Sequence, residues 1–327
     1  MTPRTEVKEE FLAAAPGQVR FKEPMRSRTS FHIGGPAEVW AEPQDAQTLR
    51  RLLLLAAEAE MPVTTVGGGA NLLVRDEGIP GLVVHLSGPG FQYFKQAVPG
   101  TGRVPGTDVL VGAALPLEWL IRRAQECSLG GVEFLAGVPG SVGGAVRMNA
   151  GTHDDAGKFH HMSDVLRSVR AMERDGQIRE LPAEALGFGY RSSSLDGRIA
   201  LQATLRFSPD DPRAISERVR RLWEFKKRTQ DWSAPSVGCI FKNPTSDVIP
   251  AQAGIGSSPV SAGWMIDQAG LKGRRFGGAM VSPRHANFIL NVDHARCSDV
   301  LALVEEAREK VLKQFGVDLE LEVQLLP

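Results

Sequence analysis

Hydrophobic positions recur along this chain at two different spacings, which together predict a mixture of helices and strands. Between residues 46 and 60 the apolar side chains recur at the spacing of one helix face. A short β-branched run at 62–66 follows and predicts a buried strand. The same reasoning predicts strands at 79–86, 107–112, 165–174, 199–207 and 317–323, and helices at 117–127, 213–229, 264–273 and 298–315. The helix at 213–229 is basic, and its charges are expected to form a solvated face.

The segments between these elements predict how the chain is organised. The first ten residues are polar and lack the apolar core of a secretory signal, and residues 1–24 are expected to form a loose leader. A Pro/Asp-rich segment at 208–212 predicts a domain boundary. The segment at 245–261 has no periodicity and few charges, which predicts a loop insertion. We therefore predict a leader at 1–24 and domains at 25–95, 96–210 and 211–327.

Composition excludes several classes of protein. With 327 residues, 42% of them hydrophobic and 23% charged, the chain can bury a sizeable core. Its formal net charge is zero, so it lacks the basic field that drives nucleic-acid binding. No apolar run is long enough to span a bilayer, so no membrane partner is expected.

Cysteine and histidine usage favours a reducing compartment and argues against a metal site. Three widely spaced cysteines suit the cytoplasm better than a disulfide framework, so a cytoplasmic location is expected. No Cys/His cluster has the spacing of metal ligands, so no metal is expected. The only close pair, His160 and His161, is interpreted as a solvated loop pair.

Two glycine-rich runs are the strongest candidates for ligand binding. The segment Gly137–Gly151 has five glycines among fifteen residues and no Lys, Asp or Glu. Successive main-chain N–H groups, free of side chains, form a concavity that suits phosphates, although a structural loop with tight turns is the alternative. The second run, Gly67–Leu73, follows the strand at 62–66, and neither run has Rossmann or P-loop spacing. Two such runs predict a dinucleotide gripped from two sides.

Residues that carry chemistry follow in the second half of the chain. Cys239 could act as nucleophile or proton donor, or could be a buried thiol that behaves as a small hydrophobe. The nearby Lys242 and Asn243 suit a phosphate or a uracil-like partner. Lys272 is a further phosphate candidate, with ordinary surface charge as its alternative.

Two more candidates are an arginine and a carboxylate. Arg191 follows a Gly-Phe-Gly turn and suits bidentate pairing with a substrate carboxylate, or else a surface salt bridge. Glu322 lies in the last predicted strand on the same face as Glu320, and a solvated carboxylate is the alternative for either.

Seven collinear motifs resemble one family, the UDP-N-acetylenolpyruvoylglucosamine reductases of bacterial peptidoglycan synthesis. Each motif is weak alone, but their common order from about residue 25 to the end is specific. The motifs lie at 29–35 (TSFHIGG), 67–73 (GGGANLL), 137–151 (GVPGSVGGA with MNAG), 189–191 (GYR), 238–244 (GCIFKNP), 262–273 (AGWMIDQAGLKG) and 319–323 (LELEV).

The resemblance implies an α+β protein with the FAD-binding fold of the vanillyl-alcohol-oxidase (PCMH) type. Two FAD-binding subdomains, at 25–95 and 96–210, would be followed by an α+β substrate domain at 211–327. The chain lacks the tyrosine-bearing insertion of one branch between Arg191 and Cys239, so it resembles the shorter branch.

The family's reaction, its cellular role and the catalytic residues are implied in the same way. NADPH would reduce FAD, and the reduced FAD would then reduce UDP-N-acetylglucosamine enolpyruvate to UDP-N-acetylmuramate. The product would serve peptidoglycan and cell wall biogenesis, and with it cell shape and cell division. Arg191 and a protonated Glu322 would stabilise the enolate, and Cys239 would give the proton where the family often has serine. A monomer is expected.

The resemblance also implies which residues bind the ligands, and the chain departs from the family at two places. Leu321 stands where the family usually has proline, and the loop at 245–261 is longer than usual. The cofactor-binding residues would be Gly67, Gly68, Gly69, Ala70, Asn71, Leu72, Gly137, Pro139, Gly140, Ser141, Gly143, Gly144, Ala145, Asn149 and Gly151. The substrate-binding residues would be Tyr190, Lys242, Asn243 and Lys272.

Two other functions stay open on the sequence. One is an FAD-dependent oxidase of the same fold that acts on another sugar or a hydroxy acid, against which Lys242, Asn243 and Lys272 argue for a nucleotide sugar. The other is a non-catalytic binding module, against which the joint presence of Arg191, Cys239 and Glu322 argues.

Overall fold

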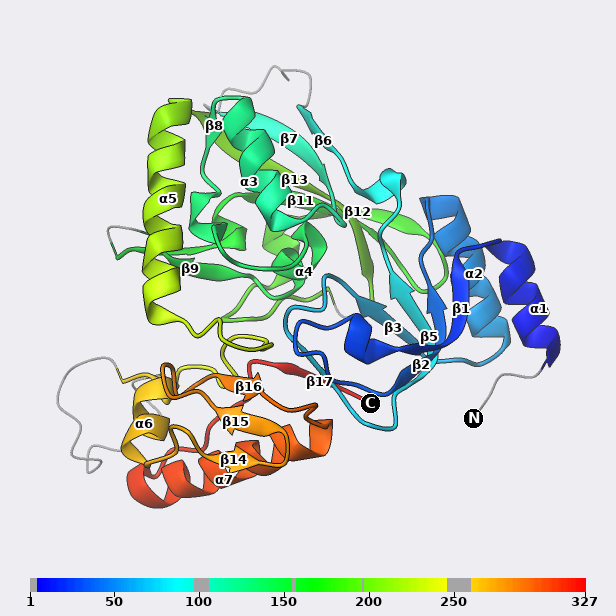
Figure 1. Cartoon of the computed structure of the whole chain (residues 1–327). Helices are drawn as coiled ribbons and strands as arrows, with labels where there is room; N and C mark the ends of the chain where they lie inside the picture. Colours follow the sequence, from blue (N-terminus) through cyan, green and yellow to red (C-terminus); the bar gives the residue numbers. More distant parts are fainter. Residues whose placement is uncertain (1–4, 97–105, 155–156, 196, 246–259) are drawn as a thin grey trace. The chain divides into compact units, whose positions relative to one another are not determined.

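The computed structural model describes residues 5–96, 106–154, 157–195, 197–245 and 260–327, and these form two compact units (Figure 1). Unit 1 consists of Met1–Lys22, Glu38–Gly68 and Pro80–Lys226, and unit 2 consists of Glu23–Ala37, Gly69–Ile79 and Lys227–Pro327. The chain therefore passes between the units several times. The predicted insertion at 245–261 lies almost entirely outside the described residues.

The chain is folded from Thr5 onward, which corrects the prediction of a loose leader for the described residues 5–24. Residues Thr5–Ala14 form helix α1 and residues Val19–Pro24 form strand β1. Phe11 is fully buried and Val19 nearly so, both in the same apolar cluster as residues of helix α2 (Ala46–Glu58). The composition of this segment did not predict the helix, because four of the ten residues of α1 are charged and Phe11 is its buried residue.

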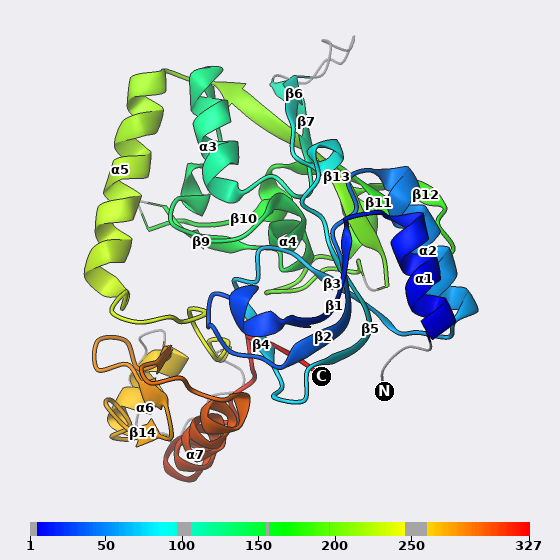
Figure 2. The ribbon, with the colours of Figure 1, turned by 45° about the vertical axis from the view of Figure 1, so that its right-hand side comes forward.

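A four-stranded sheet lies at the centre of the first part of unit 1. Its strand order is β1, β2 (Pro36–Ala41), β5 (Ile79–His85), β3 (Val63–Val66), and β3 and β5 run parallel. Helix α2 (Ala46–Glu58) begins at Asp45, whose side chain accepts a hydrogen bond from the Thr48 N–H at 2.8 Å. Helices α1 and α2 lie side by side next to this sheet in both views (Figures 1 and 2). The predicted helix and strand of this region are confirmed.

A larger antiparallel sheet forms the rest of unit 1. Its strand order is β12 (Ile178–Pro182), β11 (Leu166–Met172), β13 (Ile199–Pro209), β7 (Thr107–Gly112), β6 (Phe94–Gln96), with β8 (Leu129–Gly130) paired to the end of β13. Alternate residues of β13 are buried, as the period of a strand requires. The apolar face packs with residues of helices α3 (Leu117–Glu126), α4 (Val142–Arg147) and α5 (Pro212–Thr229).

Short elements connect these sheets. The hairpin of β9 (Gly151–His153) and β10 (Phe159–His161) follows α4. Single 3₁₀ turns are η1 (Met25–Ser27), η2 (Pro89–Phe91), η3 (Glu133–Leu135), η4 (Met162–Asp164) and η5 (Ala183–Leu186).

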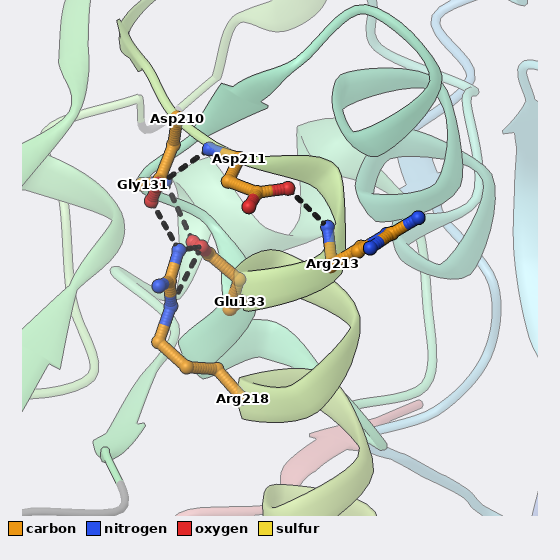
Figure 3. A network of polar contacts seen from close by, with 6 residues as sticks. All are labelled: Gly131, Glu133, Asp210, Asp211, Arg213 and Arg218. Atoms are coloured by element: carbon orange, nitrogen blue, oxygen red, sulfur yellow. Dashed lines mark hydrogen bonds and ion pairs between the residues drawn. The ribbon is translucent and has the colours of Figure 1, made fainter.

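Helix α5 belongs to unit 1, although the sequence places it in the domain at 211–327. Arg218 donates hydrogen bonds to the carboxylate of Glu133, at 2.5 Å from Nη2, and to that of Asp210 (Figure 3). Glu133 is 7% exposed and also accepts a hydrogen bond from the Gly131 N–H at 2.6 Å. The turn at Asp210 therefore starts a helix that folds back onto η3 instead of separating two domains.

Unit 2 has its own apolar core beneath a small sheet. Helix α7 (Cys297–Phe315) contributes most of one side of that core, and Gly316, at φ 70°, ends the helix. The other elements are α6 (Ala262–Gln268), the antiparallel strands β14 (Arg275–Phe276), β15 (Ala279–Val281) and β16 (Ile289–Asn291), and the parallel pair β4 (Leu72–Val74) and β17 (Gln324–Leu326). No helix within the described ranges is long and apolar enough to cross a membrane.

The last predicted strand is displaced in the structure. The prediction of a strand at 317–323 is wrong, since the ladder begins at Gln324 and only Leu321 makes an isolated bridge, to Phe241. Val317 and Leu319 are buried while Asp318 and Glu320 are exposed, so the apolar alternation is real. Alternation of burial does not by itself supply a partner strand.

Candidate active site

The start of the shorter glycine run, Gly67 and Gly68, lies against the longer run within unit 1. A Cβ atom added to Gly68 would lie 2.9 Å from the Cα of Gly140, and one added to Gly67 would lie 3.0 Å from the Oγ of Ser141. Neither position has room for a larger residue without a shift of the facing loop. The absence of side chains in these runs is therefore a condition for their close approach.

The longer run is held in a conformation that requires glycine. Gly137 has φ 71° and Gly140 has φ 117°, values that residues with a Cβ rarely adopt. The exit of the loop is fixed by main-chain hydrogen bonds, since Gly140 O accepts from Leu117 N at 3.0 Å and Gly143 N donates to Ala113 O at 2.8 Å. Gly143, Gly144 and Ala145 continue into α4.

These runs fit the pyrophosphate of a dinucleotide. Gly68 and Pro139 are exposed, so the paired loops are accessible at these two positions. Neither run contains a carboxylate that would repel phosphate. Successive N–H groups in such a loop make an anion-binding concavity.

The second half of the shorter run, from Gly69 to Leu72, belongs to unit 2. The Gly69 carbonyl accepts a hydrogen bond from Ser30 N at 3.0 Å, so the run contacts the motif at 29–35. Asn71 donates from Nδ2 to the Glu322 carbonyl at 3.0 Å, and its own carbonyl accepts from Gln324 N at 2.9 Å. Ala70 lies between these contacts, and Leu72 begins β4. Asn71 thus fixes the chain around Glu322.

In unit 1, Arg191 lies in a turn tied to the end of the longer glycine run. Its Nη1 donates to the Gly151 carbonyl at 2.9 Å, and its backbone has φ 56°. The guanidinium carbon lies 5.3 Å from the ring centroid of Tyr190 and 6.0 Å from that of Phe159. The main chain of the turn is also held by Asn149, whose Nδ2 donates to the Gly189 carbonyl at 3.1 Å. The structure thus brings Asn149, Gly151, Tyr190 and Arg191 together.

In unit 2, Cys239 and Glu322 lie on two chain segments that pair with each other. Glu322 N donates to the Ile240 carbonyl at 2.8 Å, and Lys242 N donates to the Glu320 carbonyl at 2.9 Å. Both candidate side chains are half-buried.

A buried asparagine, Asn287, holds the segment that carries Cys239. Its carbonyl accepts from Ile240 N at 2.8 Å, its Oδ1 accepts from Phe241 N at 2.9 Å, and its Nδ2 donates to the Phe241 carbonyl at 2.8 Å. Asn287 is 2% exposed. Sequence reasoning missed this residue, because a single amide in an apolar run has no spacing signal.

The predicted substrate-binding residues of unit 2 each have a protein partner. Lys242 Nζ lies 3.2 Å from Glu320, Lys272 Nζ lies 2.5 Å from Asp267, and Asn243 Oδ1 accepts from Ala262 N at 3.1 Å. The two ion pairs are partly exposed and contribute little to stability, so an anionic ligand can compete for the lysines.

The histidine pair corrects a prediction. His160 and His161 lie on β10 and are half-buried, so they are not a solvated loop pair. His160 Nε2 lies 2.8 Å from Asp154 Oδ2, and the imidazole stacks on Phe134 with ring centroids 5.6 Å apart. The environment of His160 is therefore set by Phe134 and Asp154, which are not adjacent to the histidine pair in the sequence.

The three cysteines differ in environment. Burial, together with nearby Asp76, raises the pKa of the Cys297 thiol to about 12, so this thiol stays protonated. Cys127 is exposed, and Cys239 lies between these extremes.

Lys226 is a further residue that sequence reasoning missed. The solvated face predicted for α5 is correct for Arg220 and Arg221 but wrong for Lys226, which is 4% exposed. Burial, with a smaller contribution from Arg191, lowers the pKa of its ammonium group to about 8. A signal existed in the sequence, because Lys226 lies four positions after the buried Leu222 and so on the apolar stripe of the helix.

Comparison with known proteins first defines the class. Residues 37–182 match the family model described as "FAD binding domain". A vanillyl-alcohol-oxidase-type flavoprotein from Myceliophthora thermophila aligns over 63% of this chain and 47% of its own, with 11% identity and a TM-score of 0.50, which supports the fold alone. The protein is thus an FAD-binding protein of the vanillyl-alcohol-oxidase fold, as the sequence predicts.

The family follows from closer relatives. Residues 230–326 match the C-terminal domain of UDP-N-acetylenolpyruvoylglucosamine reductase. The proteins of that name from Symbiobacterium thermophilum (reductase 2) and Bacillus velezensis are 38% and 34% identical, over 95% of this chain and 92% and 94% of their own. The Thermus caldophilus enzyme structure aligns with a TM-score of 0.74 and 35% identity over 95% of this chain and 98% of its own. The chain belongs to the UDP-N-acetylenolpyruvoylglucosamine reductase family.

Proposed function

We propose that this protein uses NADPH to reduce the enolpyruvyl group of UDP-N-acetylglucosamine enolpyruvate, which yields UDP-N-acetylmuramate for peptidoglycan synthesis. The observation that carries the proposal is the pairing of the Cys239 segment with the Glu322 segment, inside the family's C-terminal domain. This pairing brings the chain segments that carry a thiol and a carboxyl group next to each other in one unit, which supports the proposal.

The glycine runs are proposed to hold FAD. Main-chain N–H groups of Gly67–Leu72 and Gly137–Gly151 would bind its pyrophosphate. The close contact between Gly68 and Gly140 supports this proposal, because it brings the two runs together. When bound, FAD supplies the hydride that is added to the substrate double bond. NADPH is the proposed source of the electrons.

Arg191 is proposed to bind the substrate carboxylate. Hydride addition at the terminal carbon of the enolpyruvyl double bond moves negative charge onto that carboxylate as an enolate. A guanidinium group offers two parallel donors to such a charge, and the Tyr190 and Phe159 rings with the Gly151 carbonyl fix its orientation. Glu322, in its protonated form, would add a second donor to the enolate.

Cys239 is proposed to give the proton that completes the reaction. The enolate collapses when the carbon next to the carboxylate takes a proton from the Cys239 thiol. An ordinary cysteine has a pKa of about 8.5, far below that of a serine hydroxyl, so a thiol is a competent donor at neutral pH. Asn287 would keep the segment that carries this thiol in place.

The substrate's nucleotide part is assigned to polar residues of unit 2 and to Tyr190. Lys242 and Lys272 would exchange their exposed carboxylate partners for the diphosphate, and Asn243 would contact the same region. Tyr190, 39% exposed, offers a ring and a hydroxyl to the ligand.

The test is the stoichiometry of the anaerobic reaction. The account predicts one NADPH consumed for each UDP-sugar, and a product heavier by two hydrogens. The alternative, an FAD-dependent oxidase that acts on another sugar or a hydroxy acid, predicts an unchanged UDP-sugar and NADPH-independent oxygen consumption with its own substrate.

A further inference from the structure

Helix α5 runs along the segment that leads into the longer glycine run. Near its first turns, Arg218 is bound to Glu133 at the start of η3 (Figure 3). Eight residues later, about 12 Å along the helix, Lys226 donates from Nζ to the carbonyl of Ala136 at 2.6 Å. Two side chains of one helix therefore hold both ends of the short segment before Gly137.

The side chain of Lys226 also covers Gly137. A Cβ added to Gly137 would lie 2.9 Å from Lys226 Cδ and 3.6 Å from the ring of Trp223. Gly137 itself has φ 71°, so the chain turns sharply under the lysine stem. The stem and the indole together close the space in which this turn could move.

The two ends of the glycine loop are held differently. The exit is fixed by main-chain bonds from Leu117 to Gly140 and from Gly143 to Ala113. At the entry, Val138 N donates to the Leu135 carbonyl at 2.9 Å, and the Ala136 carbonyl between them points to Lys226. At the entry, a side chain from helix α5 thus adds to the main-chain bonds, whereas the two bonds named at the exit are between main-chain groups.

A lysine is a costly residue at this position. An ammonium group loses hydration when it is buried, and a methionine would fill the same apolar stripe without that loss. The charge-assisted bond to Ala136 and the negative end of the α5 dipole offset part of the cost. Only a long side chain that ends in a hydrogen-bond donor can reach the Ala136 carbonyl in this way.

We propose that Lys226 is a positioning residue for the cofactor loop. Through the Ala136 carbonyl and the covered turn at Gly137, Lys226 holds the run from Gly137 to Ser141 in the conformation that presents its main chain to a dinucleotide pyrophosphate. The inference rests on the proposed function, because it takes this loop to bind FAD.

The experiment is a titration of the apoprotein with FAD, followed by the quenching of flavin fluorescence. Lys226→Met removes the donor and keeps the length of the chain, and Lys227→Met is the matched control at an exposed neighbour. We expect the dissociation constant of FAD to rise about tenfold in Lys226→Met and to stay unchanged in Lys227→Met. Lys226→Arg keeps a cationic donor and is expected to recover most of the affinity.

The folding of each apoprotein is checked by circular dichroism and urea denaturation before titration. If Lys226→Met does not fold, Lys226→Gln, which keeps a shorter neutral donor, takes its place and is expected to weaken FAD binding as well. FAD affinity equal to that of the wild type in the folded variant overturns the inference and leaves the proposed function standing. A wild-type protein that does not bind FAD refutes the proposed function itself.

Discussion

The main-chain N–H of Glu322 donates a hydrogen bond of 2.8 Å to the carbonyl of Ile240, the residue that follows Cys239 in the sequence. This bond joins the end of the chain to a segment about eighty residues earlier in the sequence. The main chains that carry the carboxyl group and the thiol therefore stay next to each other as long as this pairing is intact. The proposed proton transfer depends on that arrangement.

Cys239 is expected to be replaceable by another proton donor but not by alanine. We predict that Cys239→Ser keeps much of the activity and that Cys239→Ala loses about 10²- to 10⁴-fold in kcat, the range for general acid catalysis. Anaerobic stopped-flow measurement of the substrate half-reaction checks this, with Cys127→Ala at an exposed cysteine as control. Equal rates in wild type, Cys239→Ser and Cys239→Ala would exclude Cys239 as the donor.

Phe159 is expected to support Arg191 through its ring. The guanidinium carbon lies 6.0 Å from the ring centroid, where a cation–π contact contributes about 0.5–1 kcal/mol. Phe159→Leu should raise KM for the UDP-sugar about two- to fivefold and leave FAD affinity unchanged. Phe159→Tyr keeps a ring and serves as the matched control. An equal rise of KM in both variants would argue against the ring's role.

Two arginines of α5 are expected to differ strongly in their effect on stability. Arg218→Met leaves Glu133, 7% exposed, without its cation and should lower the free energy of unfolding by about 2–3 kcal/mol, a value reduced for the partial exposure of Arg218. Arg220→Met removes only exposed pairs with Glu217 and Glu224 and should leave the free energy of unfolding nearly unchanged. Urea denaturation of both variants makes the comparison. If both variants lose a similar amount of free energy of unfolding, the bond between Arg218 and Glu133 contributes no more to stability than an exposed ion pair.

Lys226 is expected to make stability depend on pH in the alkaline range. Its pKa is lowered by burial from 10.5 to about 8, so between these values the unfolded chain binds more protons than the folded protein. The free energy of unfolding of the wild type should therefore rise relative to that of Lys226→Met as the pH increases from about 8 to about 10.5. Urea denaturation of both proteins near pH 7 and near pH 10 measures the difference. If the free energy of unfolding of the wild type, relative to that of Lys226→Met, stays constant or falls between these two pH values, the assignment is contradicted.

Local pattern was sufficient for much of the fold. The strand at 107–112 has the bounds predicted for it, and the helix predicted at 298–315 begins only one residue earlier. Both elements have strong periodicity and clear ends, such as Gly316 after the helix. The glycine runs were found by their composition, although residues Val142–Arg147 of the longer run form helix α4, which the composition alone did not predict.

The remaining features depend on contacts that a local pattern does not contain. Phe11 anchors an N-terminal helix through a cluster that includes residues far along the chain, and the last strand starts at Gln324 because its partner is Leu72. Lys226 becomes a buried residue only because η3 packs beside α5. Asn287 acquires its role from Phe241, about forty-five residues away in sequence. In each case the partner is distant in the sequence, so local composition and spacing do not predict the contact.

The central claim is that reduced FAD on this protein reduces UDP-N-acetylglucosamine enolpyruvate. The most direct test reduces the purified yellow protein anaerobically with one equivalent of NADPH, adds the UDP-sugar, and follows the flavin absorbance. The account predicts a rapid return of the oxidised flavin spectrum. A flavin that stays reduced until oxygen is admitted would contradict it.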